Sequence, residues 1–266
     1  METASPIIIN GHGTGLIPDP PDKRDYLYTE RLARLDTSII REEGGIPDYR
    51  DLRRRFEGVY DQGRLGSCTA QAVAGAIEYL QWLGNYETII TPSRLQLYYD
   101  ARAISNPAWI TQDSGAYLRA AAKAAADRGV APEGLWRYDI SRFTSEPPFE
   151  VYAAAELRQT LEYFRITDGS IMEMLRCLAA GFPFAFGVSV YENFWPKRGV
   201  IPIPAGAELG GHAMLAVGYS RRSRRILARN SWGANWGIKG YAWLPYEYME
   251  SAWDLWTLRS MEKPEA

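Results

Sequence analysis

The segment from residue 68 to residue 83 constrains the fold of this chain more than any other part of the sequence. It places apolar side chains on most faces of a predicted helix, namely Ala70, Ala72, Val73, Ala74, Ala76, Ile77 and Leu80. A helix that is apolar all round is buried in the centre of a protein. Gly84 follows as a residue suited to the position just past a helix end. The rest of the chain must therefore pack around this helix, which begins at Cys68.

Later segments change from helical to strand-like patterns. Asp113-Ser114-Gly115 offers a cap for a second helix over the alanine-rich residues 116–126. Asp168 is placed to cap a short helix over residues 170–180. Alternating apolar residues predict strands at residues 184–191, 214–219 and 225–229. An arginine-rich turn joins the last two of these strands. Helices early and strands late predict an α+β fold in two lobes.

The first 45 residues differ from the rest of the chain. Glycines and prolines in residues 10–15 and 18–22 disfavour regular structure and predict an extended strap. A short polar helix is predicted around residues 29–41. We therefore expect a leader, residues 1–45, ahead of a main domain that covers residues 46–266.

The bulk composition excludes several classes of protein. A chain of 266 residues that is 46% hydrophobic can bury a substantial core. A formal net charge of −2 gives no reason to expect a nucleic-acid partner, and no stretch approaches the ~18 apolar residues of a membrane span. The N-terminus lacks the basic flank of a secretory signal, which leaves the cytoplasm as the default location. Two cysteines and two histidines form no second cluster, so we expect neither a metal nor another cofactor.

Three residues that serve nucleophilic catalysis occur in order along the chain. Cys68 is one of only two cysteines, His212 lies in a glycine-rich segment, and Asn230 follows eighteen residues later. A thiol, an imidazole and an amide in this order are the parts of a cysteine nucleophile, its base and the residue that orients the base. The other cysteine, Cys177, is interpreted as an inert packing residue.

The predicted surroundings of Cys68 suit a reactive thiolate. The first turn of a helix and a protonated His212 would both lower the thiol pKa from its ordinary value of ~8.5. Because a helix dipole contributes only about 0.3–1 kcal/mol, His212 must supply most of the effect. Attack on a carbonyl creates an oxyanion, for which the Gln62 side-chain amide and the Cys68 backbone N–H are candidate donors. Trp232 is placed to shield the bond between His212 and Asn230 from water.

Two segments carry a resemblance to a known family. Gln62-Gly63-Arg64-Leu65-Gly66-Ser67-Cys68 and Asn230-Ser231-Trp232-Gly233-Ala234-Asn235-Trp236-Gly237 resemble the two signature segments of papain-family cysteine proteases. The resemblance extends over about residues 46–260, and the separation of the segments is close to the about 130–150 residues typical of the family. It implies a papain-like fold with the active site in a cleft between two lobes. The helical lobe, mainly residues 60–145, would contain a central helix that starts at the nucleophile, and a β-barrel-like lobe would follow, mainly in residues 150–260.

The same resemblance implies roles for individual residues. The catalytic residues would be Cys68, His212, Asn230 and Gln62, and the substrate-binding residues Gly66, Ser114, Gly115, Gly211 and Trp232. Gly115 falls where the family has a glycine whose backbone pairs with the substrate main chain. Leu65 stands where a disulfide cysteine is usual, and Thr69 replaces an aromatic residue after the nucleophile. These departures and the short leader resemble the bacterial and archaeal branch of the family.

We therefore expect a thiol peptidase that hydrolyses protein or peptide substrates through an acyl-enzyme. It would be a monomer, made as a zymogen whose leader inhibits it by covering the cleft and is cut near Glu42 to Gly45. A peptide ligase, transpeptidase or amidase with the same triad is an alternative, as is a catalytically silent binding module of this fold. The leader could instead be a permanent strap. The arginines of residues 221–225 are interpreted as a solvated turn, so no nucleic-acid or membrane partner is expected.

Overall fold

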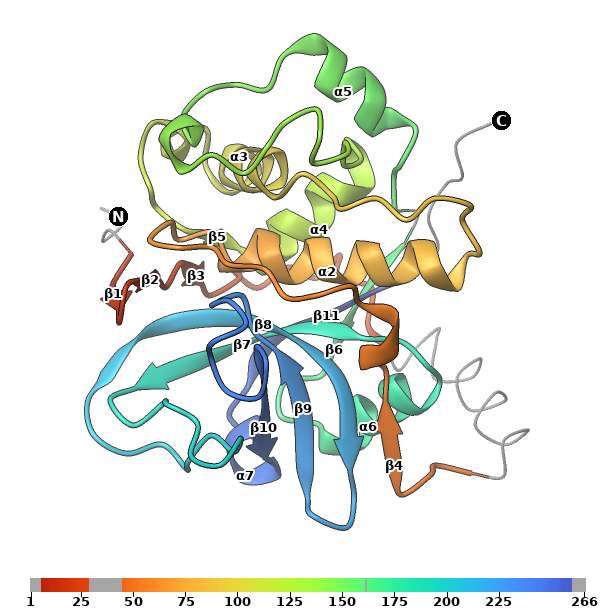
Figure 1. Cartoon of the computed structure of the whole chain (residues 1–266), viewed down its shortest axis with the longest axis vertical. Helices are drawn as coiled ribbons and strands as arrows, with labels where there is room; N and C mark the ends of the chain where they lie inside the picture. Colours follow the sequence, from red (N-terminus) through yellow and green to blue (C-terminus); the bar gives the residue numbers. More distant parts are fainter. Residues whose placement is uncertain (1–5, 29–44, 161, 260–266) are drawn as a thin grey trace.

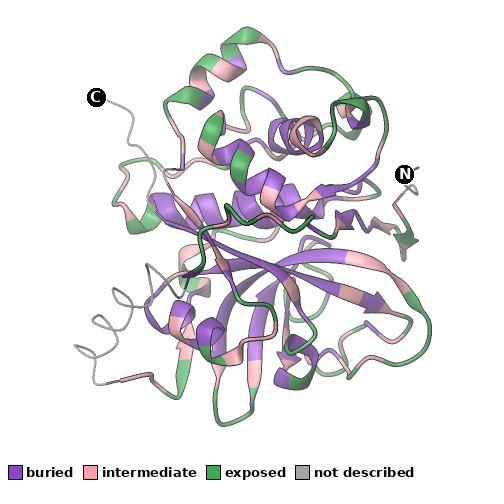
Figure 2. Ribbon diagram, turned by 180° about the vertical axis from the view of Figure 1, so that it is seen from behind, coloured by how far each residue is buried: buried purple, intermediate pink, exposed green. Residues whose placement is uncertain are grey.

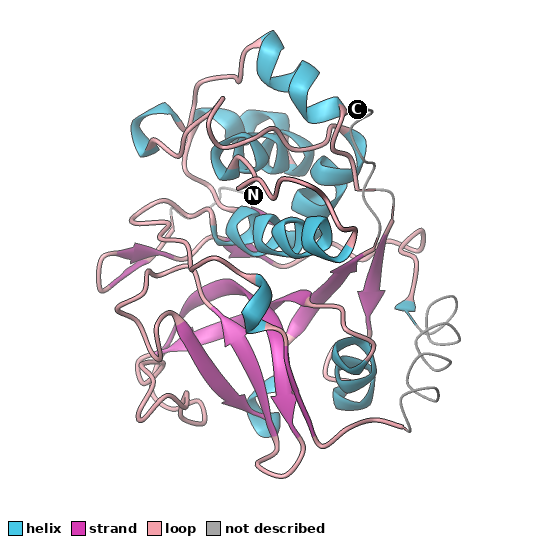
Figure 3. Ribbon diagram, turned by 45° about the vertical axis from the view of Figure 1, so that its right-hand side comes forward, coloured by secondary structure: helices cyan, strands magenta, loops and turns pink. Residues whose placement is uncertain are grey.

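The computed structural model describes residues 6–28, 45–160 and 162–259. In this part of the chain a group of helices lies on one side of a central helix and a sheet lies on the other (Figures 1 and 3). The helices are α2 (Cys68–Leu83), α3 (Arg94–Ser105), α4 (Leu118–Asp127), α5 (Phe149–Glu156), α6 (Ile171–Ala179) and α7 (Tyr246–Met249), with short 3-10 turns at Arg53–Arg55, Pro107–Thr111 and Ile140–Arg142. The strands are β1 (Ile8–Ile9), β2 (His12–Gly13), β3 (Leu16–Ile17), β4 (Tyr49–Asp51), β5 (Ala116–Tyr117), β6 (Tyr163–Ile166), β7 (Phe184–Tyr191), β8 (Glu208–Ser220), β9 (Arg225–Arg229), β10 (Tyr241–Pro245) and β11 (Trp253–Leu258).

Helix α2 is the central helix that the sequence predicts. Its first fourteen residues are all buried, including polar ones such as Gln71 and Glu78. Gly84 ends the helix, and its N–H donates to the Leu80 carbonyl. Burial on every side follows because the helical group covers one flank of α2 and the sheet covers the other (Figure 2).

The main sheet is open. Its strands run in the order β10-β9-β8-β7-β11-β6, and β4 pairs with β8 beside this path. The pairs along it are antiparallel. The expected α+β papain-like fold is confirmed, but the second lobe is built on an open sheet rather than a closed barrel.

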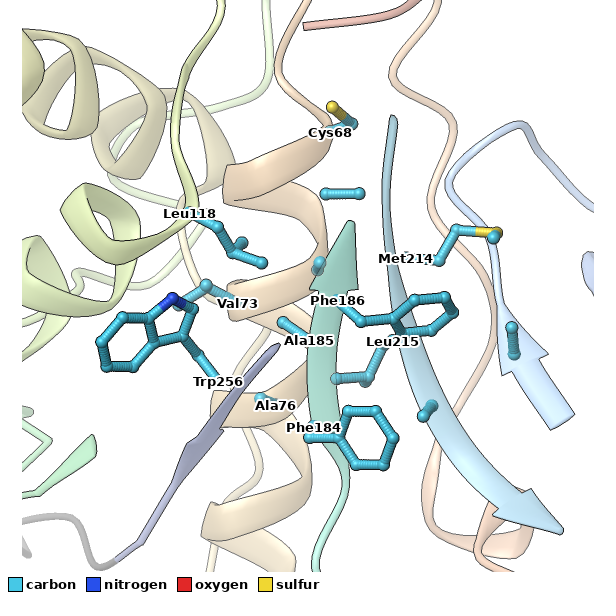
Figure 4. Close-up of a cluster of buried hydrophobic side chains, with 14 of the residues drawn as sticks. Cys68, Val73, Ala76, Leu118, Phe184, Ala185, Phe186, Met214, Leu215 and Trp256 are labelled. Atoms are coloured by element: carbon cyan, nitrogen blue, oxygen red, sulfur yellow. The ribbon is translucent and has the colours of Figure 1, made fainter. Parts of the chain in front are cut away.

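The core around α2 is made of small and branched residues of the helix and of side chains from α4 and the sheet. Figure 4 shows Val73 of α2 on the side where Leu118 of α4 and Trp256 of β11 lie. In the same view Ala185 of β7 points to the helix, whereas the Phe186 ring points away from it. Each of these side chains is buried. Burying one large apolar side chain contributes roughly 1.5–3 kcal/mol, so this layer holds the two halves of the molecule together.

Two predicted helix caps are wrong. Helix α4 begins at Leu118, after Tyr117, and has no side-chain cap, because residues 116 and 117 form strand β5 instead. Helix α6 begins after Ser170, also without a side-chain cap. Asp168 instead accepts hydrogen bonds from the Asp254 backbone N–H and from Arg165. The Asp113 carboxylate likewise accepts hydrogen bonds from the Gly66 backbone N–H and from the Tyr98 hydroxyl. Each carboxylate that the local pattern assigned to a helix end therefore has a tertiary partner instead.

The three predicted strands are present, and β8 is longer than expected because it begins at Glu208. Helices α3 and α5 and strands β6, β10 and β11 were not predicted. The predicted helix over residues 29–41 lies outside the described residues. No helix in the described ranges is long and apolar enough to cross a membrane.

Candidate active site

Cys68 is the first residue of α2 and lies directly after a glycine-containing loop. Its side chain has no exposed surface. Burial raises the pKa of the thiol to about 11. The backbone N–H groups of Ala213 and Gly15 favour the thiolate and partly oppose this increase. The contact with Ala213 N–H brings the sulfur beside the residue that follows His212. The predicted lowering of the thiol pKa is therefore not found in this closed arrangement.

His212 and Asn230 come together because strands β8 and β9 are antiparallel neighbours. Leu215 of β8 pairs with Arg229 of β9, and this pairing places His212, three residues before Leu215, close to Asn230, the residue after Arg229. His212 Nε2 and Asn230 Oδ1 are 2.7 Å apart, and both residues are buried. His212 Nδ1 has no hydrogen-bond partner among the described residues, so it is the ring nitrogen left for the thiol. Burial lowers the pKa of His212 to about 4, which the bond to Asn230 partly opposes.

Trp232 covers the histidine as predicted. Its ring centroid is 4.6 Å from that of His212, and its side chain is 2% exposed. Phe194, which the sequence analysis did not single out, packs edge-on against both rings. An apolar cover of this kind excludes water from the bond between His212 and Asn230 and strengthens it.

The Gln62 amide is held in one orientation. Its Oε1 accepts a hydrogen bond from Ser231 Oγ at 2.6 Å, and its backbone N–H donates to the Ser231 carbonyl at 2.9 Å. The side-chain Nε2 then donates to Leu65 O at 2.8 Å and to Gly13 O at 3.0 Å. Ser231 is a positioning residue that the sequence analysis missed. The predicted oxyanion donor thus points at a carbonyl oxygen of the leader.

Residues 6–17 of the leader, here called the plug, fill the cleft over Cys68. Strands β1 and β2 form a hairpin, with Asn10 and Gly11 at its tip in the left-handed backbone region. His12 stacks on Trp232, with ring centroids 5.4 Å apart and planes 13° apart. Neither Cys68 nor His212 has exposed surface beneath this segment.

Two glycines let the plug come this close. A Cβ atom added to Gly13 would lie 2.6 Å from Arg64 O, and one added to Gly15 would lie 1.9 Å from Gly66 O. Real side chains do not make such contacts with backbone, so only glycine fits at either position. The glycine repeat of the leader therefore reflects close packing against the loop before Cys68.

Three of the predicted substrate-binding glycines lie against the plug. Strand β3 pairs with β5 in parallel, and the Ala116 N–H donates to Gly15 O at 2.9 Å, next to Gly115. A Cβ on Gly211 would lie 2.5 Å from Leu16 O, and one on Gly66 would lie 2.5 Å from the Pro6 ring. Ser114, the other residue predicted near this site, has a local contact instead, because its hydroxyl donates a hydrogen bond to Gly115 O. Among the residues that the structure describes, no group of acidic, histidine and cysteine side chains could hold a metal ion.

Comparison with known proteins identifies the family. A sequence profile described as papain family cysteine protease matches residues 46–252. The chain belongs to the papain family of cysteine proteases. It is 35% identical to an uncharacterized peptidase C1-like protein of Acanthamoeba polyphaga mimivirus, over 94% of this chain and 88% of that protein.

Solved structures of papain-family proteins share its fold. Xylellain, a cysteine protease from Xylella fastidiosa, is 36% identical and superposes with a TM-score of 0.84, covering 94% of this chain and 97% of that one. A procathepsin B from Trypanosoma congolense superposes with a TM-score of 0.71 at 17% identity, covering 93% of this chain and 87% of its own. The papain-family chain described here is accordingly a cysteine peptidase, and its similarity to a bacterial enzyme agrees with the predicted branch.

Proposed function

We propose that this papain-family chain hydrolyses peptide bonds with Cys68 as nucleophile, His212 as base and Asn230 as orienter, and that it is made as a zymogen. The contacts of His212 with Asn230 and Trp232 support the roles of these residues. The observation that carries the zymogen is the Gly13 carbonyl, which accepts a hydrogen bond from Gln62 Nε2 above a fully buried Cys68.

The reaction follows from these positions. Cys68 Sγ attacks the substrate carbonyl carbon, and the thiol proton passes to His212 Nδ1. Gln62 Nε2 and the Cys68 N–H stabilise the oxyanion that forms. His212 then gives its proton to the leaving amine as the peptide bond breaks, which leaves an acyl-enzyme. A water molecule that His212 deprotonates attacks the acyl carbon and releases the acid and the thiol.

The plug explains why the two side chains are neutral in the closed form. Burial raises the thiol pKa to about 11 and lowers the imidazole pKa to about 4, so neither carries charge near pH 7. Removing the plug returns water to the cleft and relieves the desolvation that causes both shifts. We therefore expect the ion pair, and with it a reactive thiolate, to form only in the open enzyme.

The test compares Gly15→Val with Gly134→Ala in the full chain. Gly15→Val forces its side chain into Gly66 O and expels the plug, whereas a Cβ on Gly134 meets no atom within 4 Å. An epoxysuccinyl thiol-protease inhibitor is added from pH 5 to pH 9, and the modified residue is found by mass spectrometry. Gly15→Val should be labelled at Cys68 at least about a hundredfold faster at pH 7 than the parent chain and Gly134→Ala, because each pKa unit changes the thiolate fraction tenfold.

Peptide products decide between hydrolysis and the alternatives. Hydrolysis by the labelled variant supports the proposal, whereas transfer to an added amine in preference to water favours a ligase or transpeptidase. Equal labelling of Gly15→Val and the parent chain contradicts the zymogen. No labelling of correctly folded Gly15→Val at any pH contradicts the peptidase and favours a silent binding module.

A further inference from the structure

The described part of the leader has two segments with different contacts. The plug, residues 6–17, touches the groups that a substrate must reach, including Gln62 and Cys68. Beyond the exposed Pro18, residues 19–28 leave the cleft and run across the rest of the molecule. We call residues 19–28 the clamp. The polar contacts of Asp19, Asp25 and Tyr26 in the described structure involve none of the proposed catalytic residues.

Asp19 joins the helical half of the molecule to the sheet. Its carboxylate accepts the backbone N–H of Arg119, in the first turn of α4, at 3.1 Å. The same carboxylate accepts the indole N–H of Trp256, on β11, at 2.8 Å. The Asp19 backbone N–H donates to Asp254 Oδ2 at 2.6 Å. All three contacts are buried or partly buried, so one leader residue bridges α4 and β11.

Asp25 makes a second bridge between the same two halves. Its carboxylate lies 2.8 Å from Arg119 Nη2 of α4 and 3.3 Å from Arg165 Nη1 of β6. The Arg165 backbone N–H donates to Tyr26 O at 2.8 Å, and Leu27 forms a parallel bridge with Arg165 along the free edge of the sheet. The clamp thus adds backbone pairing to its ion pairs.

Several polar groups of the main domain have hydrogen-bond or ion-pair partners in the clamp. The Arg119 and Arg165 side chains are only 14% and 19% exposed, and the Trp256 side chain has no exposed surface. Without the clamp, the Trp256 indole N–H and the Arg119 guanidinium would lose these acceptors and would each need another partner. Asp254 would keep Arg165 as a partner but lose the Asp19 N–H. The clamp therefore supplies acceptors to polar groups of both halves at a distance from the cleft that the plug covers.

We propose that the clamp is a permanent part of the enzyme that holds its two halves together, and that only the plug leaves the cleft on activation. This inference deepens the proposed zymogen and rests on it for the meaning of activation. It replaces the expected loss of residues 1–45 as one unit. A cut near Glu42 to Gly45 would then leave the clamp bound and the cleft closed.

The test nicks the full chain at two different places. A recognition sequence for a site-specific protease is inserted after Ile17 in one chain and after Gly45 in another. Each chain is cut under native conditions, passed over a size-exclusion column and analysed by intact mass. Cys68 is then titrated with the epoxysuccinyl inhibitor, with the uncut chains as references.

The two nicks should give opposite results. After the cut at Gly45, the N-terminal fragment should co-elute with the body, and Cys68 should stay unreactive. After the cut at Ile17, the plug fragment should separate and Cys68 should become reactive. The proposal is overturned if the fragment cut at Gly45 dissociates from a folded, reactive body. It is equally overturned if the plug cut at Ile17 stays bound and protects Cys68.

Point variants in the chain cut at Gly45 identify the contacts responsible. Asp19→Ala combined with Asp25→Ala should release the fragment at least about tenfold faster, since each removes charge-assisted bonds in a partly buried site. Asp22→Ala is the matched control, because Asp22 pairs with the exposed Arg24 inside the leader. Equal release from the two variants would contradict the clamp. Fragment retention is measured without peptidase activity, so labelling without hydrolysis would defeat the proposed function and leave the clamp intact.

Discussion

At the scale of single residues, the chemistry of the site depends on how each polar group is held. The thiol of Cys68 stands at a helix N-terminus, which favours the thiolate, yet burial under the plug raises its pKa to about 11. Desolvation therefore outweighs the helix dipole in the closed form. The imidazole of His212 is fixed by Asn230 on one side and by Trp232 on its face. These contacts hold the ring in place for the open enzyme.

The role of Asn230 can be measured by Asn230→Ala in the Gly15→Val background. The change removes the acceptor at His212 Nε2 and frees the ring to rotate away from the thiol. A hydrogen bond to a charged group contributes about 1.5–3 kcal/mol, so kcat/KM for a peptide substrate should fall about tenfold to a hundredfold. Asn235→Ala is the matched control, since Asn235 is exposed in the same loop. Equal activity of the two variants would argue against an orienting role for Asn230.

At the scale of secondary-structure elements, α2 owes its central place to small residues. Gly75, in the middle of the helix, faces the sheet, where an added Cβ would lie 2.5 Å from Arg229 Nη1. Arg229 cannot easily move, because it is 4% exposed and donates twice to Gly58 O, at 3.0 and 2.7 Å. Glycine at position 75 lowers the helix propensity of α2, but it leaves room for the buried guanidinium of Arg229.

Gly75→Ala should accordingly lower the free energy of unfolding. The gain in helix propensity is about 1 kcal/mol, whereas overpacking a rigid site costs about 1–3 kcal/mol and here also disturbs a buried charge. We expect a net loss of about 1–2 kcal/mol, seen as a lower Tm in thermal unfolding, while Gly134→Ala keeps the parent value. A higher Tm for Gly75→Ala would mean that the helix and Arg229 can move apart at little cost.

At the scale of the whole molecule, the two halves are joined by packing and by the proposed clamp, without a disulfide. The two cysteines of the chain, Cys68 and Cys177, are buried thiols that form no disulfide in the structure. Leu65, which replaces a usual disulfide cysteine, is 2% exposed and belongs to the hydrophobic core. Apolar contact therefore takes the place of a covalent link beside the nucleophile.

The stability of the chain should therefore not depend on redox conditions. We expect the same Tm with and without a reducing agent, because reduction has no bond to break. Thiol titration in denaturant should likewise find two free thiols per chain. A clear decrease of Tm on reduction would reveal a disulfide between chains and would contradict the predicted monomer.

Local sequence patterns sufficed for the elements whose partners are close in the chain. The continuous apolar run predicts α2 from its first to its last residue, and alternation predicts β7 and β9. The two signature segments also predict the roles proposed for Cys68 and Asn230, and the order of thiol, imidazole and amide along the chain predicts the role proposed for His212. Patterns were weaker where a polar group had a distant partner. Asp168 was assigned to a helix end but bonds to Asp254, far along the chain.

Only the tertiary structure decided what covers the site and what holds the cover. Composition predicts an extended leader, but nothing local predicts that Gly13 O meets Gln62 or that His12 stacks on Trp232. Nor does it show that Asp19 and Asp25 bridge α4 to the sheet. Such contacts join residues that are distant in sequence, and their strength comes from burial. Burial exists only after the whole chain has folded, so the sequence determines the parts of the site and the fold determines their surroundings.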